Sequence, residues 1–203
     1  MNYVTNPTKE QHLFSTKQMV SLSLLTALAY VLMLIHLPFK FLGFLELEFS
    51  DVPAIVATLT YGPIAGVVVE LLKNVIKAIT ATTTGGVGEI ANFVISACYI
   101  IPLGVIFRRV QTKKKLILSF LGGIIGFVIA GIVVNYFVTV PLYAKLFGGM
   151  EAVIGAASVT IPAIKSLATV VILGITPFNI VKGIMMSAVG YYVYKMLYPV
   201  VKA

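Results

Sequence analysis

Two polar side chains interrupt an apolar stretch near the end of the chain, which reads TPFNIVKGIMMSAVGYYVY from Thr176 to Tyr194. Asn179 and Lys182 lie three residues apart, so on a helix they share one face. An amide offers both a hydrogen-bond donor and an acceptor, and an ammonium offers donors and a positive charge. This spacing predicts a polar site inside an otherwise apolar helix.

The rest of the chain is apolar enough to indicate a membrane protein. Of its 203 residues, 59% are hydrophobic and 11% are charged, and the mean hydropathy is +1.02. A soluble domain is nearer a quarter charged, and a membrane barrel would show alternating segments of about ten residues. Long continuous apolar runs instead predict an all-α membrane protein. Its net charge of +8 lies mostly at the ends of these runs, so nucleic acid is not an expected partner.

Six transmembrane helices account for the pattern, in a single domain over residues 18–200 that follows an N-terminal segment, 1–17. Asp51 is expected to cap the second helix, and the Gly62-Pro63 step separates it from the third. Pro177 suits the first position of the sixth, where its missing N–H is not needed. The helices are expected at about 18–37, from 52, at 63–81, at 89–107, from 116 to beyond 135, and from 177.

The basic residues fix the expected orientation. Lysine and arginine are enriched in cytoplasmic loops, and five of them lie between the fourth and fifth helices: Arg108, Arg109, Lys113, Lys114 and Lys115. Both termini are then cytoplasmic, and residues 141–176 form an outer loop. A partial or surface helix, or two further spans, within that loop would preserve the orientation.

With this orientation the polar groups gather at one depth. At about 1.5 Å per residue, Asn179 and Lys182 would lie only about 3–8 Å below the outer end of the sixth helix. Asn135 and Asn92 fall in the outer parts of their helices, and Glu48 lies in the first outer loop. Ionisable groups within a membrane usually face a cavity or a partner. The sequence therefore predicts a polar pocket open to the outside, with Glu48 as the partner of Lys182.

Each of these residues has a simpler structural interpretation. Lys182 could extend to the outer headgroups, Asn135 could bond to a neighbouring helix, and Asn92 could make a helix-end contact. Structural pairing is the favoured interpretation of Lys73 and Lys77, for instance of Glu70 with Lys73 or Asn74. In the segment FLELEF, the alternation of apolar residues with Glu46 and Glu48 indicates an extended chain with two faces, either a lid or a solvated loop.

Motifs for catalysis are missing from the sequence. It has no G-x-x-x-x-G-K-[ST] phosphate loop, no Ser-His-Asp set, and no metal-ligand spacing around His12 or His36. We therefore expect no catalytic residue, no metal and no cofactor. Ser23 and Ala27 form a small-xxx-small pair on the first helix, which allows close approach of another helix.

Three blocks of the sequence resemble a known family. FLELEFSDVP, YGPIAGVVVELLKN and TPFNIVKGIMMS are similar, in order and spacing, to the riboflavin-specific S component of energy-coupling factor (ECF) vitamin transporters. The resemblance extends from the first helix to the last. Asp-x-Pro and Gly-Pro-x-x-Gly occur among S components generally, whereas Pro-Phe-Asn-x-x-Lys-Gly indicates the riboflavin branch.

The resemblance implies a non-catalytic subunit of the bacterial cell membrane that binds riboflavin as a transported ligand. It implies docking onto a transmembrane coupling (T) subunit with two ATPase subunits, through Ser23 and Ala27, where the family has an Ala-x-x-x-Ala motif. Asn92 could serve the ribityl hydroxyls, and three apolar residues of the first loop could cover the flavin ring. The implied ligand contacts are Asn179, Lys182, Asn135, Glu48, Asn92, Phe44, Leu45 and Phe49.

Three other functions remain open at this point. The chain could be an S component for another vitamin. It could be an ion-coupled secondary transporter with Lys182 and Glu48 as a proton-sensitive pair, which internal inverted repeats would favour. A membrane enzyme would need a carboxylate or metal cluster at the inner face, which here is basic.

Overall fold

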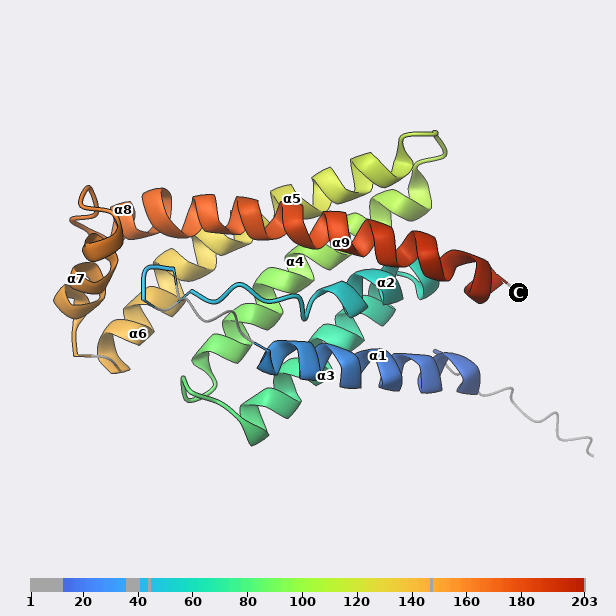
Figure 1. Cartoon of the computed structure of the whole chain (residues 1–203), viewed down its shortest axis with the longest axis horizontal. Helices are drawn as coiled ribbons and strands as arrows, with labels where there is room; N and C mark the ends of the chain where they lie inside the picture. Colours follow the sequence, from blue (N-terminus) through green and yellow to red (C-terminus); the bar gives the residue numbers. More distant parts are fainter. Residues whose placement is uncertain (1–12, 36–40, 44, 147, 203) are drawn as a thin grey trace, which may run out of the picture.

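The computed structural model describes residues 13–35, 41–43, 45–146 and 148–202. Within them the secondary structure is helical, apart from one isolated antiparallel bridge between Phe41 and Leu45. The helices lie side by side as an elongated bundle, and an extended segment, residues 45–50, runs between them toward α2 (Figure 1). An all-α architecture is therefore confirmed for the described residues.

The helices largely follow the predicted bounds. In chain order they are α1 (Thr16–Leu34), α2 (Val52–Tyr61), α3 (Pro63–Thr80), α4 (Val87–Arg109), α5 (Lys115–Val134), the π-helical turn η1 (Asn135–Thr139), α6 (Val140–Leu146), α7 (Met150–Thr160), α8 (Leu167–Thr169), the π-helical turn η2 (Val170–Ile175) and α9 (Thr176–Lys202). The first four differ from prediction by only a few residues at their ends, the level at which helix ends are poorly defined.

Four helical stretches among the described residues are long and apolar enough to cross a membrane. They cover Thr16–Leu34, Val87–Arg109, Lys115–Leu146 and Leu167–Leu197. The other two expected helices differ: α2 has only 10 residues, and α3 carries Glu70, Lys73 and Lys77. A helical membrane protein is thus supported, whereas six spans remain a prediction.

The segment after Pro141 differs from a single outer loop and contains helices, in line with the alternative of a partial helix there. Residues 141–176 do not form one long loop, because the fifth helix continues through η1 to Leu146 and the last helical stretch already begins at Leu167. Pro177 is consequently inside a helix and not at its first position. Proline removes one backbone donor there, and the π-helical turn η2 directly before it changes the hydrogen-bonding pattern. The hydroxyl of Thr176 donates to the carbonyl of Val171 at 2.9 Å within this turn.

The short helix α2 occupies the centre of the bundle. Its residues Val52 to Leu59 are all buried, and it contacts α1, α3, α4 and α9. At its end Gly62 has φ +107°, a conformation that favours glycine. Arg108 of α4 donates to the carbonyl of Tyr61 at 2.6 Å, which fixes this end of α2 beside the basic α4–α5 turn.

Small residues bring α5 close to α4. A Cβ atom on Gly126 would lie 2.1 Å from the carbonyl oxygen of Cys98, so no larger residue fits without separating the two helices. Ala130, one turn further along, is buried as well. These small residues of α5 therefore serve packing inside the bundle.

Candidate ligand-binding site

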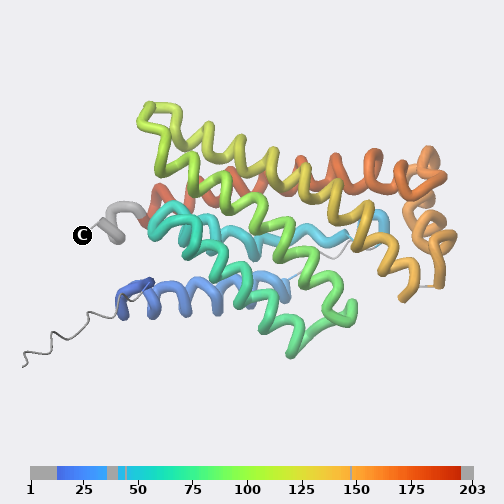
Figure 2. Tube along the Cα trace, turned by 180° about the vertical axis from the view of Figure 1, so that it is seen from behind, coloured from blue at the N-terminus to red at the C-terminus, as the bar shows by residue number. Residues whose placement is uncertain are grey.

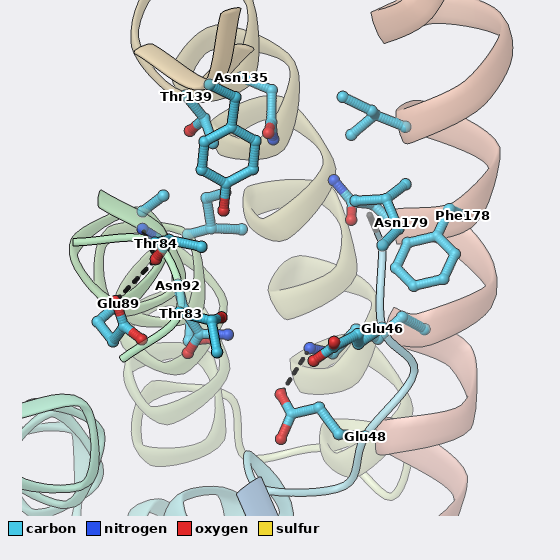
Figure 3. A pocket seen from close by; sticks show the side chains of 18 of the residues that line it. Glu46, Glu48, Thr83, Thr84, Glu89, Asn92, Asn135, Thr139, Phe178 and Asn179 are labelled. Carbon is cyan, nitrogen blue, oxygen red and sulfur yellow. Dashed lines mark hydrogen bonds and ion pairs between the residues drawn. The ribbon is translucent and has the colours of Figure 1, made fainter. Parts of the chain in front are cut away.

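A cavity of about 530 Å³ lies between the extended segment, the start of α4, η1, α6, α7 and α9. Figure 3 shows polar side chains from several of these elements directed toward it. Among the predicted ligand contacts, those that line it are Leu45, Glu48, Asn92, Asn135, Asn179 and Lys182. Residues remote in sequence thus meet at one cavity, as the sequence predicts.

The floor of the cavity holds a buried ion pair. The Lys182 ammonium lies 2.9 Å from Glu48 Oε1, and each side chain is 7% exposed. Since the helical stretch begins at Leu167, Lys182 is about 22 Å along it and not close to its end. The predicted shallow position is wrong, because it assumed a helix starting at Pro177. Lys182 is paired inside the bundle, and Glu48 is its partner as predicted.

A second group of buried charged residues, centred on Lys73, lies next to this ion pair. Lys73 of α3 donates to Asp51 Oδ1 and, at 2.8 Å, to the hydroxyl of Ser50, and its ammonium lies 2.8 Å from Glu70 Oε2. The expected structural pairing of Lys73 with Glu70 is therefore confirmed. An isolated buried charge is costly. The buried Lys73 ammonium is accordingly in direct contact with the carboxylates of Asp51 and Glu70.

The two asparagines differ in how their amides are bonded. Asn135 donates to the carbonyl of Gly131 at 2.7 Å, so its amide nitrogen bonds within its own helical stretch. The Asn179 amide nitrogen is buried and has no hydrogen-bond partner among the described residues. Buried donors are almost always satisfied. The nitrogen lies beside Gly131 of α5, where an added Cβ would be 2.2 Å from it. Because Asn179 also lines the cavity, a rotation of its side chain would bring this unsatisfied donor to a ligand acceptor.

Asn92 accepts a hydrogen bond from the Asn74 amide of α3 at 3.2 Å, so it links two helices as well as lining the cavity. It belongs to a polar stripe on α4 that sequence analysis did not single out: Glu89, Asn92, Ser96 and Tyr99. Their spacing of three, four and three residues places them on one helical face. Each is bonded to a different segment: Glu89 to Thr82 and Thr84, Ser96 to Asp51, and Tyr99 to Ser187.

The extended segment forms one wall. Phe41 and Leu45 exchange two backbone hydrogen bonds of 2.9 Å around a tight turn, and Leu45 and Glu46 line the cavity. The Phe41 ring stacks on Phe178 of α9, with centroids 5.8 Å apart and planes 9° apart. Phe178 also lines the cavity, although it was not predicted.

One predicted ring contact, Phe49, is not part of this wall. Phe49 is absent from the residues that line the cavity, whereas its neighbour Glu48 is among them. Phe44 lies outside the described residues. The loop before α4 and the first turn of α4 also contribute, since Thr83, Thr84 and Gly88 line the cavity.

The predicted docking pair lies on the outer face of α1. Ser23 and Ala27 are both exposed, whereas Leu22, Thr26, Ala29 and Met33 face the bundle. The Ser23 hydroxyl donates to the carbonyl of Met19 at 3.0 Å, so it is folded back onto its own helix. A small-residue surface is thus available on α1.

The bundle and its cavity define a helical membrane protein with a partly polar cavity inside it. The model of the family described as "ECF transporter, substrate-specific component" matches residues 17–194. The chain belongs to this family.

Relatives and a solved structure agree with this assignment. The chain is 36% identical to a protein of Bacillus subtilis (strain 168) named Riboflavin transporter FmnP, over 90% of this chain and 93% of the relative. It is 33% identical to Riboflavin transporter RibU of Staphylococcus aureus (strain TCH60), over 95% and 96%. A solved S component of a bacterial ECF transporter is similar with a TM-score of 0.71 and 34% identity, covering 92% of this chain and 98% of that chain.

Proposed function

We propose that this chain is the riboflavin-binding membrane subunit of an ECF-type vitamin importer. It is a transport component and not an enzyme, in line with its family and with the names of its relatives. The observation that carries the proposal is the buried, unpaired amide donor of Asn179 in a cavity that also contains the Lys182–Glu48 pair. This combination suits a ligand with both ring acceptors and hydroxyl groups.

Riboflavin matches the chemistry of the wall. Its isoalloxazine ring is flat, with donors and acceptors at one edge, and its ribityl chain carries hydroxyls. The Asn179 amide can pair with the polar edge, and Lys182 and Glu48 can serve hydroxyls. Leu45 and Phe178 supply apolar surface for the ring. Small-molecule sites commonly combine apolar walls with a few such polar groups.

A six-span topology with the cavity open to the outside completes the proposal. The α4–α5 turn and the end of α9 lie at one end of the molecule, and α7 and α8 at the other (Figures 1 and 2). The turn carries the exposed basic residues Arg109, Lys113 and Lys114, so that end is cytoplasmic by the positive-inside rule. The cavity, with α7 in its wall, is then on the outer side of a bacterial plasma membrane.

Docking is assigned to the exposed face of α1. Ser23 and Ala27 are flanked by the exposed apolar residues Leu24 and Leu28, and small residues permit close helix contact in a membrane. We assign this face to the transmembrane coupling subunit, which would be joined by two ATPase subunits. The domain over residues 18–200 then supplies both surfaces.

Riboflavin titration of the detergent-purified chain tests the function. Riboflavin is fluorescent, so stoichiometric quenching, with a flavin spectrum that remains through gel filtration, is the expected result. Thiamine added in excess should not compete, because the site is assigned to a flavin. Absence of quenching by riboflavin at micromolar protein, with the chain folded by circular dichroism, would reject the assignment.

A further inference from the structure

Asp51 begins α2 but does not use its side chain as a helix cap. An aspartate at this position usually accepts a backbone hydrogen bond from the first turn, and no such bond is present. Asp51 Oδ1 instead accepts from Lys73 and, at 2.9 Å, from Ser96. Asp51 Oδ2 lies 3.5 Å from the Lys182 ammonium. The side chain is thus turned away from its own helix toward three partners on other elements.

We propose that Asp51 is a positioning residue for Lys182, a role that rests on the proposed function. Asp51 is only 1% exposed and is absent from the cavity wall, whereas Lys182 lines it. Lys182 therefore has one carboxylate beside the ligand, Glu48, and a second behind the wall. Glu48 can turn toward a ligand hydroxyl while Asp51 keeps the ammonium in place.

The hydrogen bonds of Asp51 agree with its role as the carboxylate that holds Lys182 in place. Two donors hold Oδ1, so the carboxylate cannot rotate freely, and Oδ2 has no hydrogen-bond partner among the described residues. Lys73 does not depend on Asp51 alone, because Glu70 lies 2.8 Å from its ammonium. The negative charge at Oδ2 is consequently directed at Lys182.

The substitution Asp51→Asn isolates this charge. Lys73 and Ser96 would still donate to the amide oxygen, so the amide nitrogen would occupy the place of Oδ2 and turn its hydrogens toward the Lys182 ammonium. Glu48 would then be the remaining carboxylate beside the Lys182 ammonium. A ligand that bonds to Glu48 or Lys182 would have to break the contact between them. Packing would change little, since the two side chains have nearly the same shape.

The experiment is a double-mutant cycle of Asp51→Asn and Lys182→Met, with riboflavin affinity measured by fluorescence quenching. Asp51→Asn should raise Kd at least tenfold in the otherwise unchanged protein and less than twofold when Lys182 is already methionine. Ser187→Ala is the matched control, because it removes a buried hydrogen bond between α4 and α9 outside the cavity wall. It should leave Kd within twofold. An unchanged Kd in Asp51→Asn, or losses that multiply in the double variant, would overturn the proposal.

A ligand-free readout separates this inference from the proposed function. The melting temperature of the same four proteins, followed by circular dichroism, should show a drop for Asp51→Asn that shrinks in the Lys182→Met background. Additive drops would mean that Asp51 does not act on Lys182, whatever the ligand. If the unmodified chain fails to quench riboflavin, the proposed function fails, and the melting temperatures alone decide the role of Asp51.

Discussion

Replacement of Asn179 by alanine should act on stability and on binding in opposite directions. In the ligand-free protein its amide nitrogen is buried without a hydrogen-bond partner among the described residues, and an unsatisfied buried group costs about 1–3 kcal/mol. Removing it relieves this penalty at the expense of some packing. The free energy of unfolding should therefore stay constant or rise, although a buried side chain is shortened.

The affinity for riboflavin should fall in the same variant. A ligand acceptor that loses its buried donor gives up about 1–3 kcal/mol, or roughly 5- to 150-fold in Kd. Fluorescence quenching measures Kd, and circular dichroism measures the melting temperature, where 1 kcal/mol corresponds to about 2–4 °C for a chain of this size. We expect a melting temperature that is unchanged or up to about 4 °C higher.

Ser187→Ala serves as the control on the same helix. Its hydroxyl is fully engaged, with Tyr99 at 2.6 Å and the carbonyl of Gly183 at 2.6 Å. This variant should lose stability and keep its affinity, the reverse of the Asn179 variant. If Asn179→Ala behaved like Ser187→Ala, the asparagine would be a packing residue and the unpaired donor would not mark a ligand contact.

Three further predictions concern the ion pair, the helix contact and the docking face. Lys182→Met should lower stability by about 3–5 kcal/mol, because Glu48 is left charged and buried, and adding Glu48→Gln should restore part of it; thermal unfolding of both variants would show whether the restoration occurs. Gly126→Val should unfold at a much lower temperature, since even its Cβ would lie 2.1 Å from the carbonyl oxygen of Cys98; an unchanged melting temperature would contradict this contact. Ala27→Trp should bind riboflavin normally and fail in cellular uptake, and normal uptake would remove this face from the docking surface.

Sequence patterns predicted the charged residues that line the cavity better than the aromatic ones. The alternation in FLELEF indicates an extended chain, and Glu48 does pair with Lys182. That pairing follows from the high cost of an unpaired ion in an apolar bundle. Apolar residues have no such constraint. Phe49 and Phe178 are equally suitable from their type, yet only Phe178 lines the cavity.

Helix limits were predictable where local chemistry decides them and not where packing does. As predicted, α2 begins directly after Asp51, but the predicted side-chain cap is absent. Pro177 failed as a start signal because the chain before it is helical through a π turn. Such turns depend on neighbouring helices and on hydroxyls such as that of Thr176. The spacing of Ser96 and Tyr99 was visible, but their partners lie on other helices.

The length of α2 explains why a charged site exists inside this bundle. Ten residues span about 15 Å, half of a hydrocarbon core about 30 Å thick. Because Arg108 fixes the end of α2 at the basic end of the molecule, its first residue lies near the middle of the bundle. The chain must reach that depth in extended form, and Glu48, Ser50 and Asp51 are carried inward with it.

Exposed non-helical backbone is not tolerated at that depth unless protein or a water-filled cavity surrounds it. The extended segment meets this condition, because Leu45, Glu46 and Glu48 line the cavity and Ser50 and Asp51 bond Lys73. A full-length second helix would keep these groups outside the bundle and leave Lys182 without a carboxylate. The shortened helix and the buried lysine on α9 therefore require each other, and lengthening α2 by one turn before Asp51 should abolish riboflavin binding even if the bundle still forms.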